Sequence, residues 1–385
     1  MTRLPTGFSA HVCNVGIKDS TDDLVIVVAD TPVASSAVFT RSTFAGASVL
    51  ISRQHATRAV ARAMVIISKN SNVATGAQGA ANAREVVEDV ARHLGCPPEE
   101  VLIASTGVIG RQYPMDRLRA GLASLPATFS NTDATAVARA MMTTDTVAKV
   151  ASADVAGSAA RIVGTAKGVG MIEPKMATHI SLVMTDARID SRDLDTIFRR
   201  VVDRTLNRVS VDGDTSTSDT SVCMASGAAG DVDLGAFEAA LDDVMLSLTK
   251  QIARDGEGAT KLIEVRVDHA GSDHQAEVVA RSIVNSPLVK TAVHGADPNW
   301  GRVAMAIGKC SEFVDVDQER VIIRFGTQEV YPRQVDENGL SELSRYMRGT
   351  DVLIHVTLNT GDATTTMWGC DLSDGYVRIN ADYTT

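Results

Sequence analysis

Short apolar runs recur along the chain and predict buried strands. Polar residues or glycine-rich turns bound each run, which is typical of strands inside a sheet. The clearest runs are residues 24–28, 64–67, 101–104 and 180–184. We therefore expect strands in several separate parts of the chain.

Helical periodicity lies between these runs. One set of apolar residues shares a single helix face before Gly95 and Pro97, which are residues that stop a helix. Its members are Ala83, Val86, Val87, Val90 and Leu94. A second set, within residues 241–252, has the same spacing. Helices that alternate with buried strands predict a layered α/β or α+β fold.

The last third of the chain contains hairpin-like pieces at residues 320–331 and 352–367. The second piece has a turn signal, Asn359-Thr360-Gly361, between alternating residues. Residues 157–170 are rich in glycine and alanine. We expect either a linker there or a loop with unusual backbone dihedrals.

The composition supports a well-buried globular protein. The chain has 385 residues, of which 44% are hydrophobic and 4% are aromatic. This length is enough for two ordinary domains or one large one. A core with few aromatic residues must be built from aliphatic side chains, alanine and methionine, which suits layered α/β packing.

Charge and cysteine content restrict the partners and the compartment. The formal net charge is -10, and the sequence has no cluster of Lys and Arg that would bind the phosphates of a nucleic acid. Five widely spaced cysteines without a CxxC pair indicate neither a disulfide framework nor a zinc site. No apolar stretch is long enough for a signal peptide or a membrane span. We therefore expect a cytoplasmic protein without a nucleic-acid or membrane partner.

Thr178 has two interpretations. It follows a segment that contains glycines and a proline, and it begins an apolar strand. A lone Thr in such a place is ordinarily a β-branched structural residue. If the chain is cleaved before Thr178, however, the free α-amine has a pKa of about 7.7 to 8.0 and can act as a general base for the Thr hydroxyl. Such a nucleophile needs neither a histidine nor a metal.

Other common catalytic patterns are missing from the sequence. The eight histidines are scattered without a zinc-ligand spacing. The sequence has no GxSxG elbow and no papain-like cysteine signature. The segment DGEGATK at 255–261 lacks the GxxxxGK[ST] spacing of a phosphate-binding loop. We expect no nucleotide, no metal and no other cofactor.

The segment KGVGMIEPKMATHI, at 167–180, resembles the cleavage-site motif of the ornithine acetyltransferase family. These are glutamate N-acetyltransferases of the bifunctional arginine biosynthesis type, in which the Thr after Met-Ala becomes a new N-terminus. Further segments occur in the family's order: IASTGVIGRQ, MMTTDT, DGDTSTSDT, DGEGATK, VHGADPNWGRV and the ending NADYTT. Because they run from about residue 70 to the last residue, the resemblance covers nearly the whole chain.

The resemblance implies cleavage between Ala177 and Thr178, with Thr178 as the nucleophile. It also implies that Thr106 and Gly107 form the oxyanion hole, although the pair alone would be an ordinary strand-ending turn. The substrate-binding residues that it implies are Thr143, Lys167, Thr178, Glu257, Asn380 and Thr385.

These residue types suit the implied substrates. Lys167 would bind a substrate α-carboxylate, and Glu257 would contact the cationic end of ornithine. Without the resemblance, Lys167 would be interpreted as a solvated loop lysine and the loop around Glu257 as a helix stop. The C-terminal residues would be interpreted as a frayed end of the chain.

The family's reaction moves an acetyl group from N-acetylornithine to glutamate through an acetyl-Thr178 enzyme, so the implied activity is a ping-pong acyltransferase. Some relatives also use acetyl-CoA. The implied fold is a DmpA-like or ArgJ-like α/β sandwich in which residues 1–177 and 178–385 form two interwoven chains. A smaller C-terminal lobe is expected at about 280–385, and two copies of each chain are expected to form a heterotetramer.

The sequence leaves two alternatives open. An amidase or aminopeptidase with an N-terminal nucleophile would use the same Thr178 and release the acyl group to water. An uncleaved, non-catalytic relative would keep the fold and lose the chemistry. The sequence also departs from the family at His179, where an apolar residue is common, and at Val169, where a small residue is common.

Overall fold

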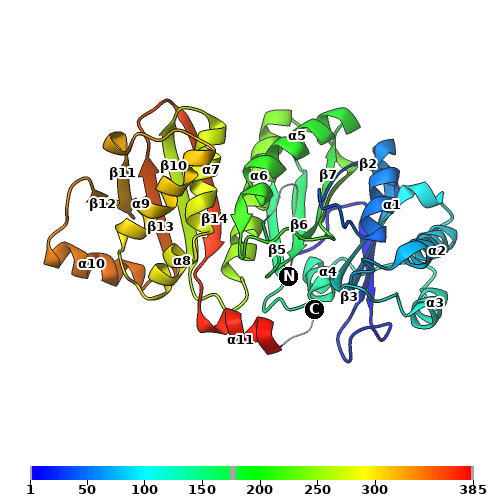
Figure 1. Ribbon diagram of the computed structural model, residues 1–385. Helices are drawn as coiled ribbons and strands as arrows, with labels where there is room; N and C mark the ends of the chain where they lie inside the picture. The colour runs from blue at the N-terminus through cyan, green and yellow to red at the C-terminus, as the bar shows by residue number, and fades with distance from the viewer. Residues whose placement is uncertain (1, 174–178, 383–385) are drawn as a thin grey trace.

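The computed structural model describes residues 2–173 and 179–382. This part of the chain forms a mixed α/β fold with one sheet of eight strands and one of six, and helices cover each sheet (Figure 1). The predicted α/β class is confirmed. Among the described helices, none is long and apolar enough to cross a bilayer.

The larger sheet is built from both sides of the predicted cleavage site. Its strands are β1 (Phe8–Cys13), β2 (Leu24–Phe39), β3 (Val60–Asn70), β4 (Val101–Val108), β5 (Lys149–Asp154), β6 (Arg161–Lys167), β7 (Ile180–Arg188) and β9 (Thr220–Asp231). Their order is β4-β3-β2-β9-β7-β6-β5, and β1 pairs with β2. Strands β9 and β7, which follow residue 178, therefore lie between β2 and β6, which precede it.

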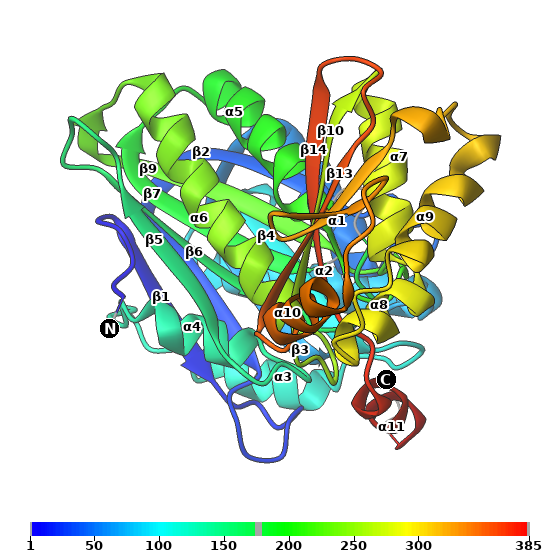
Figure 2. The same cartoon turned by 90° about the vertical axis from the view of Figure 1, so that its left-hand side faces the viewer.

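Helices cover both faces of this sheet. They are α1 (Ala47–His55), α2 (Gly76–Leu94), α3 (Met115–Ala123), α4 (Ala134–Met141), α5 (Ser191–Arg204) and α6 (Leu234–Arg254). One face packs against α4. The opposite face packs against α2 and α3 near β4, against α5 near β2 and against α6 near β6. Figure 2 shows α5 and α6 on the other side of the sheet from α4.

The smaller sheet has the order β12-β11-β13-β10-β14-β8. Its strands are β8 (Val209–Ser210), β10 (Leu262–Ala270), β11 (Ile322–Phe325), β12 (Gln328–Tyr331), β13 (Asp351–Thr357) and β14 (Ala363–Cys370). One face packs against α7 (Asp273–Val284), α8 (Pro287–His294), α9 (Trp300–Gly308) and α10 (Glu337–Met347). The lobe predicted at about 280–385 contains most of these elements but not β8, β10 or the first half of α7.

Two links join the sheets. Leu262 and Trp368 of the smaller sheet belong to the same apolar cluster as α6, so this helix lies between the sheets. After β14, the chain forms α11 (Asp374–Asp382), which lies below the junction of the two sheets in Figure 1. Helix α11 thereby returns toward the larger sheet.

Most elements predicted from hydrophobic periodicity are confirmed. The apolar runs at 24–28, 64–67, 101–104 and 180–184 lie in β2, β3, β4 and β7. The predicted helix before Gly95 is the second half of α2, and Gly95 caps it in the left-handed conformation with φ 65°. The second predicted helix lies in α6, and residues 320–331 contain the antiparallel pair β11–β12.

The hairpin predicted at 352–367 is wrong. Its two strands, β13 and β14, do not pair with each other, because β10 lies between them and pairs with both. The turn residues instead cross the end of β10, where the amides of Leu358 and Thr360 donate to the carbonyls of Asp268 and His269. A strand contributed from about a hundred residues earlier cannot be read from a local turn signal.

The prediction of a linker or loop at 157–170 is wrong for half of that segment, although Gly157 and Gly168 near its ends do have positive φ. Residues 161–167 form β6, an interior strand of the larger sheet. Small residues are needed there because α6 crosses closely: a Cβ added at Gly164 would lie 2.8 Å from Cδ1 of Leu248. The glycine thus reflects helix–sheet packing rather than a loop.

Candidate active site

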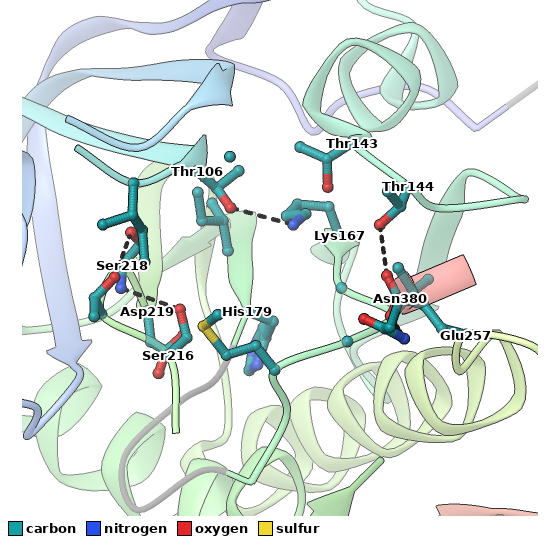
Figure 3. A pocket seen from close by; sticks show the side chains of 18 residues that line it. Thr106, Thr143, Thr144, Lys167, His179, Ser216, Ser218, Asp219, Glu257 and Asn380 are labelled. Atoms are coloured by element: carbon teal, nitrogen blue, oxygen red, sulfur yellow. Dashed lines mark hydrogen bonds between the residues drawn. The ribbon is translucent and has the colours of Figure 1, made fainter. Parts of the chain in front are cut away.

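A cavity of about 120 Å³ lies where several strands of the larger sheet end. Figure 3 shows that its lining comes from distant parts of the chain. Thr106 is contributed by the end of β4, Lys167 by the end of β6 and His179 by the residue before β7. Its size suits a small molecule rather than a macromolecule.

Thr106 and Gly107 lie in the last part of β4, which is parallel to β3. Gly107 pairs with Lys69 and has φ 134°, in the region that favours glycine. A Cβ at this position would overlap the carbonyl carbon of Lys69. The backbone of β3 therefore requires glycine here, and this close approach fixes the position of the Thr106-Gly107 backbone.

Lys167 brings a buried cation to the cavity. Its side chain is buried, and its Nζ donates to Oγ1 of Thr106 across 3.3 Å (Figure 3). Burial lowers the pKa of Lys167, and the neighbouring carboxylate of Asp145 opposes this shift. The sequence interpretation of Lys167 as a solvated loop residue is therefore wrong.

Asp145 ties together the segments that carry Thr143 and Lys167. Its carboxylate accepts the backbone N–H of Thr143 at 3.0 Å and that of Gly168 at 2.7 Å. It also accepts from Nζ of Lys149 at 2.7 Å. Burial alone would raise the pKa of Asp145, but Lys167 and Lys149 lower it to about 2. Asp145 is thus an anion that holds two sides of the cavity together.

Glu257 presents a carboxylate at another side of the cavity, in the turn that follows α6. Oε1 accepts from the hydroxyl of Thr144 at 3.1 Å, and Oε2 accepts from Nδ2 of Asn380 at 2.9 Å. The Glu257 backbone N–H donates to the carbonyl of Val169 at 2.9 Å. Three distant segments therefore orient one negative group, which is chemically suited to a cationic ligand.

The remaining side is formed by residues 216–219, which lead into β9, and by His179. Asp219 and His179 are both buried. Burial raises the pKa of Asp219 well above its usual range. Burial also lowers the pKa of His179 to about 3, helped by the charge of Lys167, so this imidazole is neutral at physiological pH.

A model of the ArgJ family matches residues 9–385. This chain belongs to the ArgJ family.

Among its relatives is the glutamate N-acetyltransferase Oat2 of Streptomyces clavuligerus, 53% identical over all of this chain and 98% of the relative. The arginine biosynthesis bifunctional protein ArgJ 2 of a Nostoc species is 51% identical over 99% of this chain and 98% of its own. A solved structure of the ArgJ bifunctional protein from Bacillus halodurans is 44% identical, with a TM-score of 0.49 over 51% of this chain and 96% of that chain. The resemblance seen in the sequence is confirmed for the full length of the chain.

The cavity of this ArgJ-family chain brings together six of the residues predicted from the sequence. They are Thr106, Gly107, Thr143, Lys167, Glu257 and Asn380. Ala177, Thr178 and Thr385 lie outside the described residues. The chemical roles given to all nine stay predictions.

Sequence reasoning missed several charged residues in and beneath the cavity. Asp219 belongs to the DTSTSDT segment, which served only as a family mark. Asp145 belongs to MMTTDT, from which only a substrate-binding Thr was chosen. Asp255 belongs to DGEGATK, from which only Glu257 was chosen. Lys149 has no sequence signal, because the burial of a single charged residue depends on packing between distant segments.

Proposed function

We propose that this chain is a glutamate N-acetyltransferase that transfers acetyl from N2-acetylornithine to glutamate in arginine biosynthesis. Membership of the ArgJ family and the names of its relatives support this activity. The main structural support is that one small cavity contains the predicted oxyanion hole, the buried Lys167 and the oriented carboxylate of Glu257. The cavity also includes His179, the residue that follows the proposed nucleophile.

The proposed enzyme first cleaves itself. The Thr178 hydroxyl attacks the carbonyl of Ala177, the peptide C–N bond breaks, and an ester forms that carries a free α-amine. Water then hydrolyses the ester and releases two chains, residues 1–177 and 178–385. The new α-amine is the general base for the Thr178 hydroxyl in later turnovers.

The transfer then proceeds in two half-reactions. The Thr178 oxygen bonds to the acetyl carbon, its proton passes to the α-amine and then to the leaving nitrogen, and ornithine departs. The amine of glutamate attacks the acetyl ester in turn and restores the hydroxyl. Thr106 and Gly107 donate to the oxyanion of each tetrahedral intermediate, and a donor of this kind can contribute about 3 to 4 kcal/mol.

The charged groups of the cavity suit the substrates. Glu257, held by Thr144 and Asn380, is the proposed partner of the cationic end of ornithine. Lys167 is the proposed partner of a substrate carboxylate. Thr143 and Thr385 complete the proposed substrate contacts, and the mechanism uses no cofactor.

Assembly and location form part of the same proposal. The two chains are expected to stay together, since β7 and β9 pair with β6 and β2 from the other side of the cleavage site. Two copies of each chain form the proposed heterotetramer, and the proposed location is the cytoplasm.

Intact mass spectrometry of the purified protein and of Thr178→Ala tests this function. We expect two chains for the natural protein, and an acetyl mass on the 178–385 chain after exposure to N-acetylornithine. Glutamate should remove that mass and yield N-acetylglutamate. Removal at the same rate by water alone would identify an amidase instead, and a single unmodified chain would exclude the mechanism.

A further inference from the structure

Asp219 carries a buried carboxyl oxygen that has no partner in the described part of the chain. The residue is 2% exposed and lines the cavity, and no donor among the described residues reaches its Oδ2. Asp186 in the same sheet provides a contrast, because its two carboxyl oxygens accept the backbone N–H groups of Arg161 and Thr6 at 2.8 and 3.1 Å. A buried carboxyl oxygen without a donor is costly, so a ligand is expected to supply one to Oδ2 of Asp219.

A second unpartnered atom lies on the neighbouring strand. Strands β7 and β9 are parallel, with Ile180 opposite Thr220, and the amide of Thr220 donates to the carbonyl of His179 at 3.0 Å. His179 and Asp219 therefore lie side by side, on the same face of the sheet. Nδ1 of His179 is also buried without a partner among the described residues.

The next positions along this face determine what His179 can offer. Its Nε2 lies 3.2 Å from Oγ of Ser181, whose hydroxyl pairs with that of Ser221 at 2.5 Å. When Nε2 donates to Ser181, Nδ1 carries a lone pair and can only accept. The low pKa of His179 keeps the ring neutral.

The charges around Asp219 favour a cationic donor. Lys167 is the charged group that acts on its carboxyl, and the hydroxyls of Ser216 and Thr40 also lower its pKa, but burial outweighs all three. Lys167 itself donates to Thr106 and lies near Asp145. Two acceptors side by side, one of them able to become an anion, match a group with several N–H donors and a positive charge.

We propose that Asp219 binds a primary amine inside the cavity, with Nδ1 of His179 as a second acceptor. The inference rests on the proposed function, which supplies two such amines. One is the α-amine that cleavage before residue 178 creates, one peptide unit from His179. The other is the α-amine of glutamate, the acetyl acceptor. In both cases Asp219 is a positioning residue that holds the amine by a charged hydrogen bond.

Asp219→Asn tests the proposal, with Asp186→Asn as the matched control. Both changes replace a buried carboxyl of the larger sheet by an amide of equal size. The measurements are self-cleavage, thermal unfolding, kcat and KM for N-acetylornithine and for glutamate, and the rate of acetylation by p-nitrophenyl acetate, a donor without an amine. We expect Asp219→Asn to unfold within a few degrees of the natural protein and to lose activity about 100-fold, as when a proton-transfer group is misplaced.

The pattern of loss identifies the amine. If the amine is that of the chain, kcat and the acetylation rate with p-nitrophenyl acetate fall together while KM is unchanged. If the amine belongs to glutamate, KM for glutamate rises, while KM for N-acetylornithine and acetylation by p-nitrophenyl acetate are unchanged. Constants within twofold of those of Asp186→Asn would overturn the proposal. The proposed function would still stand in that case, provided that the natural protein is acetylated and Thr178→Ala is not.

If Asp219→Asn fails to fold, His179→Leu replaces it in the same measurements. This substitution removes the second acceptor and keeps a side chain of similar size. We expect a loss of about tenfold with the same pattern. Unchanged constants would again overturn the proposal.

Discussion

Nζ of Lys149 lies 2.7 Å from Oδ1 of Asp145, and neither side chain is exposed to solvent. A second carboxylate, that of Asp255, lies 2.5 Å from the same nitrogen. Asp255 also accepts the backbone N–H of Thr146 at 3.1 Å. These three side chains form a buried charged triad that connects the segment of Thr143 to the end of α6, next to Glu257.

Lys149→Met should strongly destabilise the protein, because it leaves two buried carboxylates without their shared cation. We expect a loss of about 3 to 5 kcal/mol in the free energy of unfolding, measured by urea denaturation. Arg188→Met is the control, since its ion pair with Asp231 is 3.5 Å long and exposed. That variant should change stability by less than about 1 kcal/mol. Equal stability of the two variants would contradict a role for the triad.

Acid should destabilise the fold through Asp145. Its pKa in the folded protein is about 2, below the ordinary aspartate value of 3.8, because Lys167 and Lys149 outweigh the opposing effect of burial. A carboxyl with a lowered pKa contributes stability above its unfolded pKa and loses it as the pH falls toward the folded value. Between pH 5 and pH 2, the unfolding free energy of the natural protein should fall about 2 kcal/mol more than that of Asp145→Asn. Parallel curves in urea titrations would refute this linkage.

Gly107→Ala should damage both the fold and the chemistry. The added methyl group overlaps the carbonyl carbon of Lys69, and alanine disfavours φ 134°. We expect a loss of about 2 kcal/mol or more and at least tenfold lower kcat, since Thr106 must shift. Gly110→Ala is the control, because that glycine also has positive φ but open space around its Cα. If thermal unfolding and kcat are the same for both variants, the close approach of β3 and β4 has no functional effect.

Glu257→Gln should weaken binding of the cationic substrate more than it slows the chemistry. The amide keeps the size of the side chain and removes the negative charge that Thr144 and Asn380 orient. We expect KM for N-acetylornithine to rise about tenfold or more, as for a lost hydrogen bond to a charged group, with kcat changed less than threefold. Glu264→Gln, on the smaller sheet, should leave both constants unchanged. A purely kcat effect at Glu257 would argue against substrate recognition.

Local patterns predicted the elements whose burial depends on near neighbours. The α2 periodicity and Gly95 are such a case, because the helix face and its cap lie within the same few turns. The hairpin at 352–367 failed because β10, which is distant in sequence, pairs between its two strands. Gly164 was taken as a loop residue because the helix that packs on it follows some 80 residues later.

The residues of the candidate site also divide into those that local motifs predict and those that depend on contacts between distant segments. Thr106, Lys167 and Glu257 were found through motifs, since each lies in a short segment that resembles the family. Asp145 and Lys149 depend on a buried ion pair, and Asp219 depends on the absence of a donor around one oxygen among the described residues. The buried ion pair and the unpartnered oxygen both arise from contacts between distant segments, so they could be recognised only in the folded structure.

The position of β7 and β9 inside the larger sheet affects how the protein can be produced. If the two halves are made as separate chains, each half contains only some strands of the larger sheet. Without β9 and β7, strands β2 and β6 expose unpaired backbone N–H and C=O groups, and such open edges promote aggregation. We therefore expect that the halves, expressed separately and mixed, do not reconstitute the protein, whereas the single translated chain does. The peptide connection between the halves then assists folding, because it keeps β7 and β9 close to β6 and β2 until they pair. It is no longer needed once the sheet has formed.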